Sequence, residues 1–154
     1  MLKYVDVMET FAEVPDEITL AINLSNCPHR CKRCHSEYLQ KDIGEELTTQ
    51  KLQELIEKHK GVSCVAFLGG DNDPESLFKL AKFIKSKFNL KTCWYSGTDY
   101  LITDDIKLIA SSLDYVKFGS YQEERGPLTN PNTNQMFWKK EDNKWNNITY
   151  KFWK

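Results

Sequence analysis

Residues 18–36 read ITLAINLSNCPHRCKRCHS and join the two features that decide the fold. The first part, residues 18–24, alternates apolar residues with polar or small ones, which predicts a β-strand. The second part, residues 26–36, places cysteines at positions 27, 31 and 34 among basic residues and histidines. No core strand has this composition, so we interpret the second part as a loop that follows the strand directly, with a short helix beginning near Cys34.

Three further strands are predicted after this loop. Residues 62–68, VSCVAFL, form a near-continuous apolar run, which is typical of a strand buried on both faces of a parallel sheet. Residues 91–95, KTCWY, and 114–118, DYVKF, are two more short strands, which end at Ser96-Gly97 and at Gly119. Ligands of open α/β sheets bind at the carboxyl ends of such strands, so the cysteine loop and the loop at residues 69–73 are expected to face the same site.

Three amphipathic helices are predicted between the strands, with Thr48, Asp73 and Thr103 as their N-caps. Gly61 follows the first helix at the position of a left-handed C-terminal cap. The second helix has Pro74 in its first turn. It also has lysines at positions 79, 82, 85 and 87, which we interpret as a solvated face.

The alternation of strands and helices predicts an α/β fold, either an open parallel sheet or a small incomplete (βα) barrel. About four strands are visible, fewer than the eight of a closed barrel. Residues 1–154 are expected to form a single domain. Residues 125–135 are loop-like, and residues 136–154 are an irregular, aromatic-rich segment in which a hairpin around residues 141–143 is possible. We expect these aromatic side chains mainly to pack, with a partner-docking patch as the alternative.

The composition argues against several functions. The formal net charge is −1 and no basic block is present, so no nucleic acid is expected as partner. No apolar run approaches the roughly 20 residues of a membrane span, and the acidic residues near the N-terminus argue against a signal peptide. We therefore expect a cytoplasmic protein without a membrane partner. Its five cysteines are expected to be reduced thiols or ligands and not disulfides.

The three loop cysteines are candidate metal ligands. Cys64 and Cys93 lie inside apolar strands, so they are expected to be buried and not to reach the loop. Three thiolates suit either a zinc site completed by His29 or His35, or an iron–sulfur cluster in which one iron has no protein ligand. The spacing alone does not choose between them. A parallel sheet behind the loop favours the cluster, because zinc ribbons do not need such a scaffold.

Four motifs together resemble the radical S-adenosylmethionine (SAM) superfamily, and within it the activating proteins of anaerobic (class III) ribonucleotide reductases. The CxxxCxxC loop follows the first predicted strand, and FLGGDNDP at residues 67–74 resembles the Gly-Gly-Glu/Asp loop of the superfamily. WYSG at residues 94–97 resembles a strand end of glycyl-radical activating enzymes. Thr-Asn-Gln at residues 133–135 is similar to the Ser-Asn-Gln of the class III activating proteins. The resemblance spans residues 17–137.

The resemblance implies a [4Fe-4S] cluster held by Cys27, Cys31 and Cys34, with SAM bound at the fourth iron. An electron from a reduced flavodoxin or ferredoxin would cleave SAM to methionine and a 5′-deoxyadenosyl radical. That radical would take a hydrogen atom from a glycine of the partner, the large subunit of an anaerobic ribonucleotide reductase, and leave a glycyl radical there. No side chain is assigned a catalytic role beyond the cluster and SAM.

The resemblance also implies a set of SAM contacts. The backbone at Gly69 and Gly70 would approach the methionine part of SAM, and Asp71 would accept a hydrogen bond from its ammonium group. The other expected contacts are Arg33, Cys34 and His35 near the adenine, Ser96 and Gly97 in the wall of the pocket, and Asn134 and Gln135 toward the cofactor or the partner.

Two kinds of alternative remain. Another radical SAM enzyme, either a pyruvate formate-lyase-type activase or a deazaguanine-forming synthase, would use the same cluster. The chain looks too short to enclose a small substrate, which favours a protein substrate. From a different class, a non-catalytic zinc-binding interaction module would use Cys27, Cys31, Cys34 and His35, and it would be colourless and bind no SAM.

Overall fold

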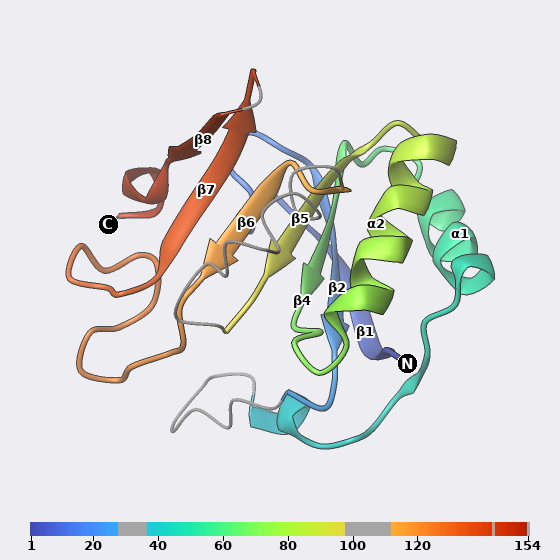
Figure 1. Ribbon diagram of the computed structural model, residues 1–154, viewed down its shortest axis with the longest axis horizontal. Coiled ribbons are helices and arrows are strands. Elements are labelled where there is room, and N and C mark those ends of the chain that lie inside the picture. The colour runs from blue at the N-terminus through green and yellow to red at the C-terminus, as the bar shows by residue number, and fades with distance from the viewer. Residues whose placement is uncertain (28–36, 98–111, 143, 154) are drawn as a thin grey trace.

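The computed structural model describes residues 1–27, 37–97, 112–142 and 144–153. In these residues eight strands form one mixed sheet, in the order β3-β1-β2-β4-β5-β6-β7-β8 (Figure 1). No helix of these ranges is long and apolar enough to cross a membrane. In chain order the strands are β1 (Lys3–Thr10), β2 (Thr19–Leu24), β3 (Glu45–Glu46), β4 (Cys64–Leu68), β5 (Lys91–Tyr95), β6 (Tyr115–Phe118), β7 (Met136–Glu141) and β8 (Lys144–Asn147).

The centre of the sheet is parallel and both of its sides are antiparallel. Strands β2, β4, β5 and β6 run in the same direction. Strand β1 pairs antiparallel with β2 and β3 on one side, and β7 pairs antiparallel with β6 and β8 on the other. The sequence analysis missed β1, because its acidic and exposed positions hide the strand pattern. The radical SAM type of barrel stays a prediction.

The sheet separates two apolar cores. The first core contains α1 (Thr49–Lys58) and α2 (Pro74–Lys87), which lie on one side of the sheet (Figure 1). Side chains alternate along the strands, so Val65 and Phe67 of β4 join this first core, whereas Cys64 and Ala66 join the second. The second core is covered by the β1–β2 connection, the β6–β7 loop and the C-terminal segment, which contribute Val14, Leu128 and Ile148.

Both described α-helices begin where the sequence predicts. Thr48 Oγ1 accepts the N–H of Lys51 at 3.1 Å, and Asp73 Oδ1 accepts the N–H of Ser76 at 3.3 Å. The prediction for Gly61 is wrong, because α1 ends with His59 as its cap and Gly61 does not have a positive φ. The predicted helix capped by Thr103 lies outside the described residues. A 3₁₀-helix, Glu37–Gln40, follows the cysteine loop.

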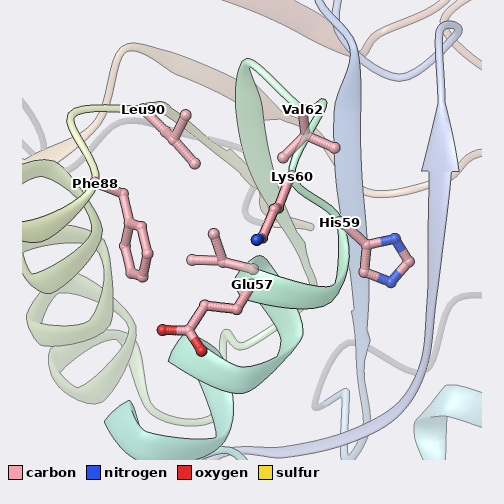
Figure 2. A pocket seen from close by; sticks show the side chains of 7 residues that line it. Glu57, His59, Lys60, Val62, Phe88 and Leu90 are labelled. Carbon is pink, nitrogen blue, oxygen red and sulfur yellow. The ribbon is translucent and has the colours of Figure 1, made fainter.

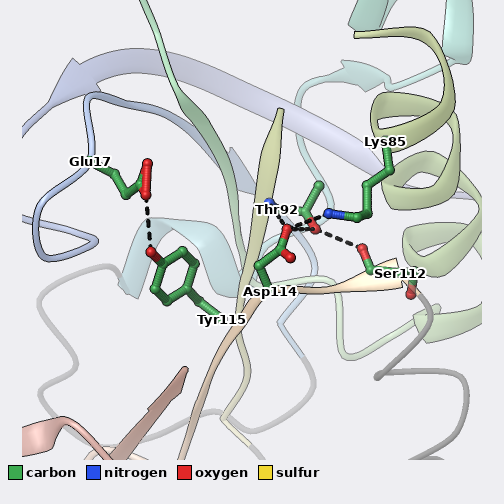
Figure 3. A network of polar contacts seen from close by, with 6 residues as sticks. All are labelled: Glu17, Lys85, Thr92, Ser112, Asp114 and Tyr115. Carbon is green, nitrogen blue, oxygen red and sulfur yellow. Dashed lines mark hydrogen bonds and ion pairs between the residues drawn. The ribbon is translucent and has the colours of Figure 1, made fainter. Parts of the chain in front are cut away.

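The interpretation of the α2 lysines as a solvated face is wrong for Lys85. Its Nζ donates to Asp114 Oδ2 at 2.5 Å, and Asp114 is only 8% exposed (Figure 3). The same carboxylate oxygen accepts the N–H of Thr92 at 3.0 Å, and Thr92 Oγ1 donates to the carbonyl of Ser112 at 2.6 Å. This network joins α2 to the amino ends of β5 and β6.

The C-terminal segment is more regular than the sequence predicts. β7 and β8 form the expected antiparallel hairpin, and a 3₁₀-helix, Thr149–Phe152, follows it. Most of the aromatic side chains pack, as predicted: Trp138 and Trp145 lie against the first core, and the Phe152 ring lies 4.9 Å from that of Phe137. Tyr150 and Trp153 are exposed.

Candidate functional site

The carboxyl ends of the four parallel strands lie along one edge of the sheet. Each is followed by residues that the sequence analysis singled out: β2 by Cys27, β4 by Gly69 and its neighbours, β5 by Ser96-Gly97, and β6 by Gly119. The order β2-β4-β5-β6 therefore brings Cys27, after β2, and the Gly-Gly-Asp loop, after β4, to neighbouring strand ends. This edge is the candidate site.

Backbone hydrogen bonds hold Cys27 in place at this edge. Cys27 is half-buried, and its N–H donates to the carbonyl of Leu39 at 3.0 Å. The preceding residue, Asn26, has φ +59° and donates its N–H to the carbonyl of Lys41 at 2.9 Å. The residues before and after the cysteine loop are therefore hydrogen bonded to each other. Cys31, Cys34, Arg33 and His35 lie outside the described residues.

Gly69 and Gly70 are required by the fold itself. They have φ values of +107° and +91°, which residues with a side chain rarely adopt. A Cβ at Gly69 would lie 3.1 Å from the carbonyl oxygen of Leu24, at the end of β2. A Cβ at Gly70 would lie 2.7 Å from Leu77 Cδ1 and 3.0 Å from Leu24 Cδ1, in the first core. Close packing thus explains both glycines, and their approach to SAM stays a prediction.

Asp71 joins the loop after β4 to the end of β5. Its Oδ1 accepts the hydroxyl of Ser96 at 2.5 Å, and its Oδ2 accepts the N–H of Gly97 at 2.9 Å. The same two loops are also joined by the indole N–H of Trp94, which donates to the carbonyl of Gly69 at 2.7 Å. The structure therefore brings together Gly69, Gly70, Asp71, Ser96 and Gly97, which the sequence analysis grouped from two separate motifs.

Lys117 is a site residue that the sequence analysis missed. It lies in β6, all four residues of which are buried, and it is itself only 8% exposed. Its Nζ donates to the carbonyls of Ser96 at 3.2 Å and Gly119 at 2.9 Å. The available signal in the sequence was a lysine between two apolar residues of the short strand DYVKF.

The Thr-Asn-Gln motif closes the β6–β7 loop. Thr133 Oγ1 donates to the carbonyl of Gly126 at 3.1 Å, and Asn134 Nδ2 donates to the carbonyl of Ser120 at 3.1 Å. Gln135 is buried and its Nε2 donates to the carbonyl of Gly119 at 3.4 Å. Asn134 Oδ1 is buried and has no hydrogen-bond partner among the described residues. The motif thus lies at the end of β6, close to Lys117.

Cys64 and Cys93 are poor candidates for metal ligands. Both side chains are fully buried in the sheet, as predicted. Burial raises the pKa of both thiols well above the ordinary value, so the thiolate form that a metal needs is disfavoured. The described residues contain no group of three His, Cys, Asp or Glu side chains that could hold a metal. A cluster in this chain would thus draw its thiolates from Cys27 and from the two cysteines outside the described residues.

A pocket of about 290 Å³ lies away from this edge. Figure 2 shows that it is lined from the ends of α1 and α2 and from the residues that lead into β4 and β5. It therefore lies at the amino ends of the parallel strands, with Val62, Phe88 and Leu90 among its lining residues. The candidate site is at the opposite ends of these strands.

Comparison with known proteins identifies a family. Residues 18–137 match the sequence model of a family described as a 4Fe-4S single cluster domain. This segment begins directly before β2 and ends in β7, so it contains the cysteine loop, all four parallel strands and the Thr-Asn-Gln motif. No curated protein and no solved structure matches the chain significantly.

Proposed function

Because the chain belongs to the 4Fe-4S single cluster domain family, we propose that it is a radical SAM activase, which generates a glycyl radical on an anaerobic ribonucleotide reductase. Family membership makes the chain an iron–sulfur protein and argues against the zinc module. The finer assignment rests on the motifs of the cysteine loop, of residues 67–74 and 94–97, and of residues 133–135.

The number of available thiolates carries the proposal. A [4Fe-4S] cluster commonly takes four cysteine ligands, but burial removes Cys64 and Cys93 from the five cysteines of this chain. Cys27, Cys31 and Cys34 would hold three irons and leave the fourth for SAM. Such a cluster, with SAM and one electron, supplies the cleavage of SAM to methionine and a 5′-deoxyadenosyl radical.

The residues of the candidate site would bind and orient SAM. Asp71 already accepts hydrogen bonds from Ser96 and Gly97, but each carboxylate oxygen can accept more than one. It would accept a further bond from the ammonium group of SAM and hold Ser96-Gly97 in the wall of the pocket. We assign Asn134 and Gln135 to the cofactor side, because a buried amide is a poor contact for a docking protein.

The partner would be the large subunit of the reductase. Its glycine would give a hydrogen atom to the 5′-deoxyadenosyl radical, so that 5′-deoxyadenosine and a glycyl radical are the products. A reduced flavodoxin or ferredoxin would supply the electron.

The test begins with anaerobic reconstitution of the whole chain and measurement of iron, sulfide and zinc. We expect about four irons and four sulfides per chain. Dithionite and SAM should then yield 5′-deoxyadenosine, and addition of the reductase subunit should yield a glycyl radical by electron paramagnetic resonance. Stoichiometric zinc without the nucleoside would refute the proposal. The nucleoside without the glycyl radical would restrict it to another radical SAM enzyme.

Two pairs of variants test the residue assignments. Cys31→Ala should abolish cluster binding and nucleoside formation, whereas its control, Cys64→Ala, should keep both. Asp71→Ala should weaken SAM binding at unchanged iron content. Its control is Asp73→Ala, which removes the cap of α2 two residues further on and should cost stability but not SAM affinity. Equal SAM affinity in the Asp71 and Asp73 variants would leave Asp71 with a structural role only.

A further inference from the structure

Lys117 keeps an ammonium group inside the sheet at the candidate site. Its Nζ donates to Ser96 O and Gly119 O, and it lies 5.9 Å from the centre of the Tyr95 ring. Ser96 and Gly119 directly follow β5 and β6, so one ammonium group bonds to the carbonyls at the ends of two adjacent strands. Burying an ammonium group is costly unless its hydrogen bonds are made, so its position here calls for a specific reason.

Through these bonds Lys117 holds Ser96 from several directions. The N–H of Ser96 donates to the carbonyl of Lys117 at 2.8 Å, and the carbonyl of Ser96 accepts from Lys117 Nζ. The hydroxyl of Ser96 donates to Asp71. On its other side, Lys117 shares the carbonyl of Gly119 with the amide of Gln135. Lys117 therefore links Asp71, Ser96 and Gly97 to the Thr-Asn-Gln motif.

We propose that Lys117 is the positioning residue of the SAM pocket. By binding the carbonyls of Ser96 and Gly119, it fixes Ser96-Gly97 against Asp71. This inference rests on the proposed function, because it assigns a ligand to the edge that Lys117 holds. Without the ammonium group, two buried carbonyls lose a charged hydrogen-bond donor. They can then lower their free energy by turning toward water and accepting hydrogen bonds from it. Ser96-Gly97 would then lose their orientation, and SAM would bind more weakly at unchanged cluster content.

Lys85 offers a matched control on the same pair of strands. Its ammonium group bonds to Asp114 at the amino ends of β5 and β6, opposite the candidate site (Figure 3). Its side chain is 30% exposed, so it is also partly buried. Lys85→Met and Lys117→Met thus make the same chemical change, each removing a lysine that holds this pair of strands. They differ in the end of the strands that is affected.

The experiment measures three quantities in the reconstituted protein: iron content, the free energy of unfolding and the dissociation constant of SAM. For Lys117→Met we expect unchanged iron and SAM binding weakened about tenfold or more, the scale of a lost charged hydrogen bond. For Lys85→Met we expect lower stability and SAM affinity within about twofold of wild type, because the site is untouched. Lys117→Gln keeps a donor without the charge, so it should fold more readily and bind SAM with intermediate affinity.

A fourth readout does not need SAM. In the cluster-free protein, the amide hydrogens of Ser96 and Gly97 should exchange faster in Lys117→Met and Lys117→Gln but not in Lys85→Met. The inference would be overturned if SAM affinity fell in proportion to the loss of stability, and to the same degree, in the variants of both lysines. Unchanged amide exchange at Ser96 and Gly97 would overturn it as well. If the wild-type protein holds its cluster but binds no SAM, the proposed function fails, and amide exchange still decides whether Lys117 positions these residues.

Discussion

Gly70 has to satisfy backbone geometry and packing at once. Its φ of +91° favours glycine, and its missing Cβ leaves room for Leu24 and Leu77 of the first core. The same residue belongs to the Gly-Gly-Asp motif that the sequence analysis assigned to SAM. At the scale of single residues, one glycine thus allows the close packing of the first core and also places Asp71 toward Ser96.

Gly70→Ala should therefore destabilise the protein before any ligand is considered. We expect a loss of about 1–3 kcal/mol, because the positive φ and the contact with Leu77 both oppose a methyl group. Urea unfolding of the cluster-free protein measures this loss. Gly61→Ala is the control, because nothing lies within 4 Å of its Cβ position and its φ is not positive. Equal stability of the two variants would contradict the packing argument.

The buried thiol of Cys64 should make stability depend on alkaline pH. Burial, followed by the charge of Glu17, raises the pKa of Cys64 above its ordinary value of 9.0, so the folded state keeps the proton. The unfolded thiol ionises near pH 9, so this contribution is fully present below that pH and is lost as the pH rises above it.

Above pH 9, each such thiol should lower the free energy of unfolding by up to about 1.4 kcal/mol for each further pH unit. Urea unfolding of the cluster-free protein between pH 8 and 11 measures the slope. Cys64→Ala should show a shallower decrease than wild type, although its stability at pH 7 is slightly lower because of the lost packing. Parallel curves for the two proteins would show that the buried thiol does not contribute.

At the scale of elements, side chains fix α2 to the sheet at the end opposite the candidate site. Asp114 accepts hydrogen bonds from Lys85 and from the buried N–H of Thr92, so one carboxylate joins a helix and two strands. On the other face of the sheet, Glu17 accepts the hydroxyl of Tyr115 at 3.0 Å (Figure 3). It also accepts the hydroxyl of Ser63 at 2.8 Å. The amino ends of the strands are thus closed by polar networks.

Asp114→Ala should lower the free energy of unfolding by about 2–4 kcal/mol, because it leaves the N–H of Thr92 and the ammonium group of Lys85 without this acceptor. Thermal and urea unfolding measure the effect. Lys79→Met is the control on the same helix, because the Lys79–Glu75 pair is exposed and should contribute less than about 0.5 kcal/mol. A loss below 1 kcal/mol for Asp114→Ala would contradict a network that holds α2.

At the scale of the whole molecule, the described residues on either side of the cysteine loop belong to neither core. The described residues of both cores come from the strands, the helices and the covering segments, and none of them lies between residues 25 and 46. The loop is attached to this body at its ends, where Asn26 and Cys27 bond to Lys41 and Leu39. We therefore expect a cluster held by this loop to form after the sheet has folded.

Removal of the cluster should therefore leave the sheet folded. After treatment of the reconstituted protein with an iron chelator, we expect an unchanged far-ultraviolet circular dichroism spectrum and a cooperative unfolding transition. Increases in amide exchange should be confined to residues 26–41 and the loops beside them. Loss of the cooperative transition on chelation would show instead that cluster binding and folding are coupled, as in small zinc domains.

The sequence by itself determined the order of the central strands and helices, two helix caps and the burial of Cys64 and Cys93. These features depend on local patterns: apolar periodicity, capping residues and short apolar runs. The cysteine spacing likewise determined that an iron–sulfur cluster had to be considered, which the family match supports. The three thiols could be recognised as a group of candidate ligands because they are close in the chain, whereas the choice between zinc and a cluster depended on the predicted fold.

Only the tertiary structure decided which long-range contacts stabilise the sheet and the candidate site. The placement of β1 at the antiparallel side, the Lys85–Asp114 bond and the packing of Gly70 against Leu24 join residues far apart in the chain. The role of Lys117 has the same origin. In the sequence a lysine suggests solvent, but the pairing of β5 with β6 and the loop that closes over them bury its ammonium group against two carbonyls. Side-chain burial follows from such pairings, which no local pattern specifies.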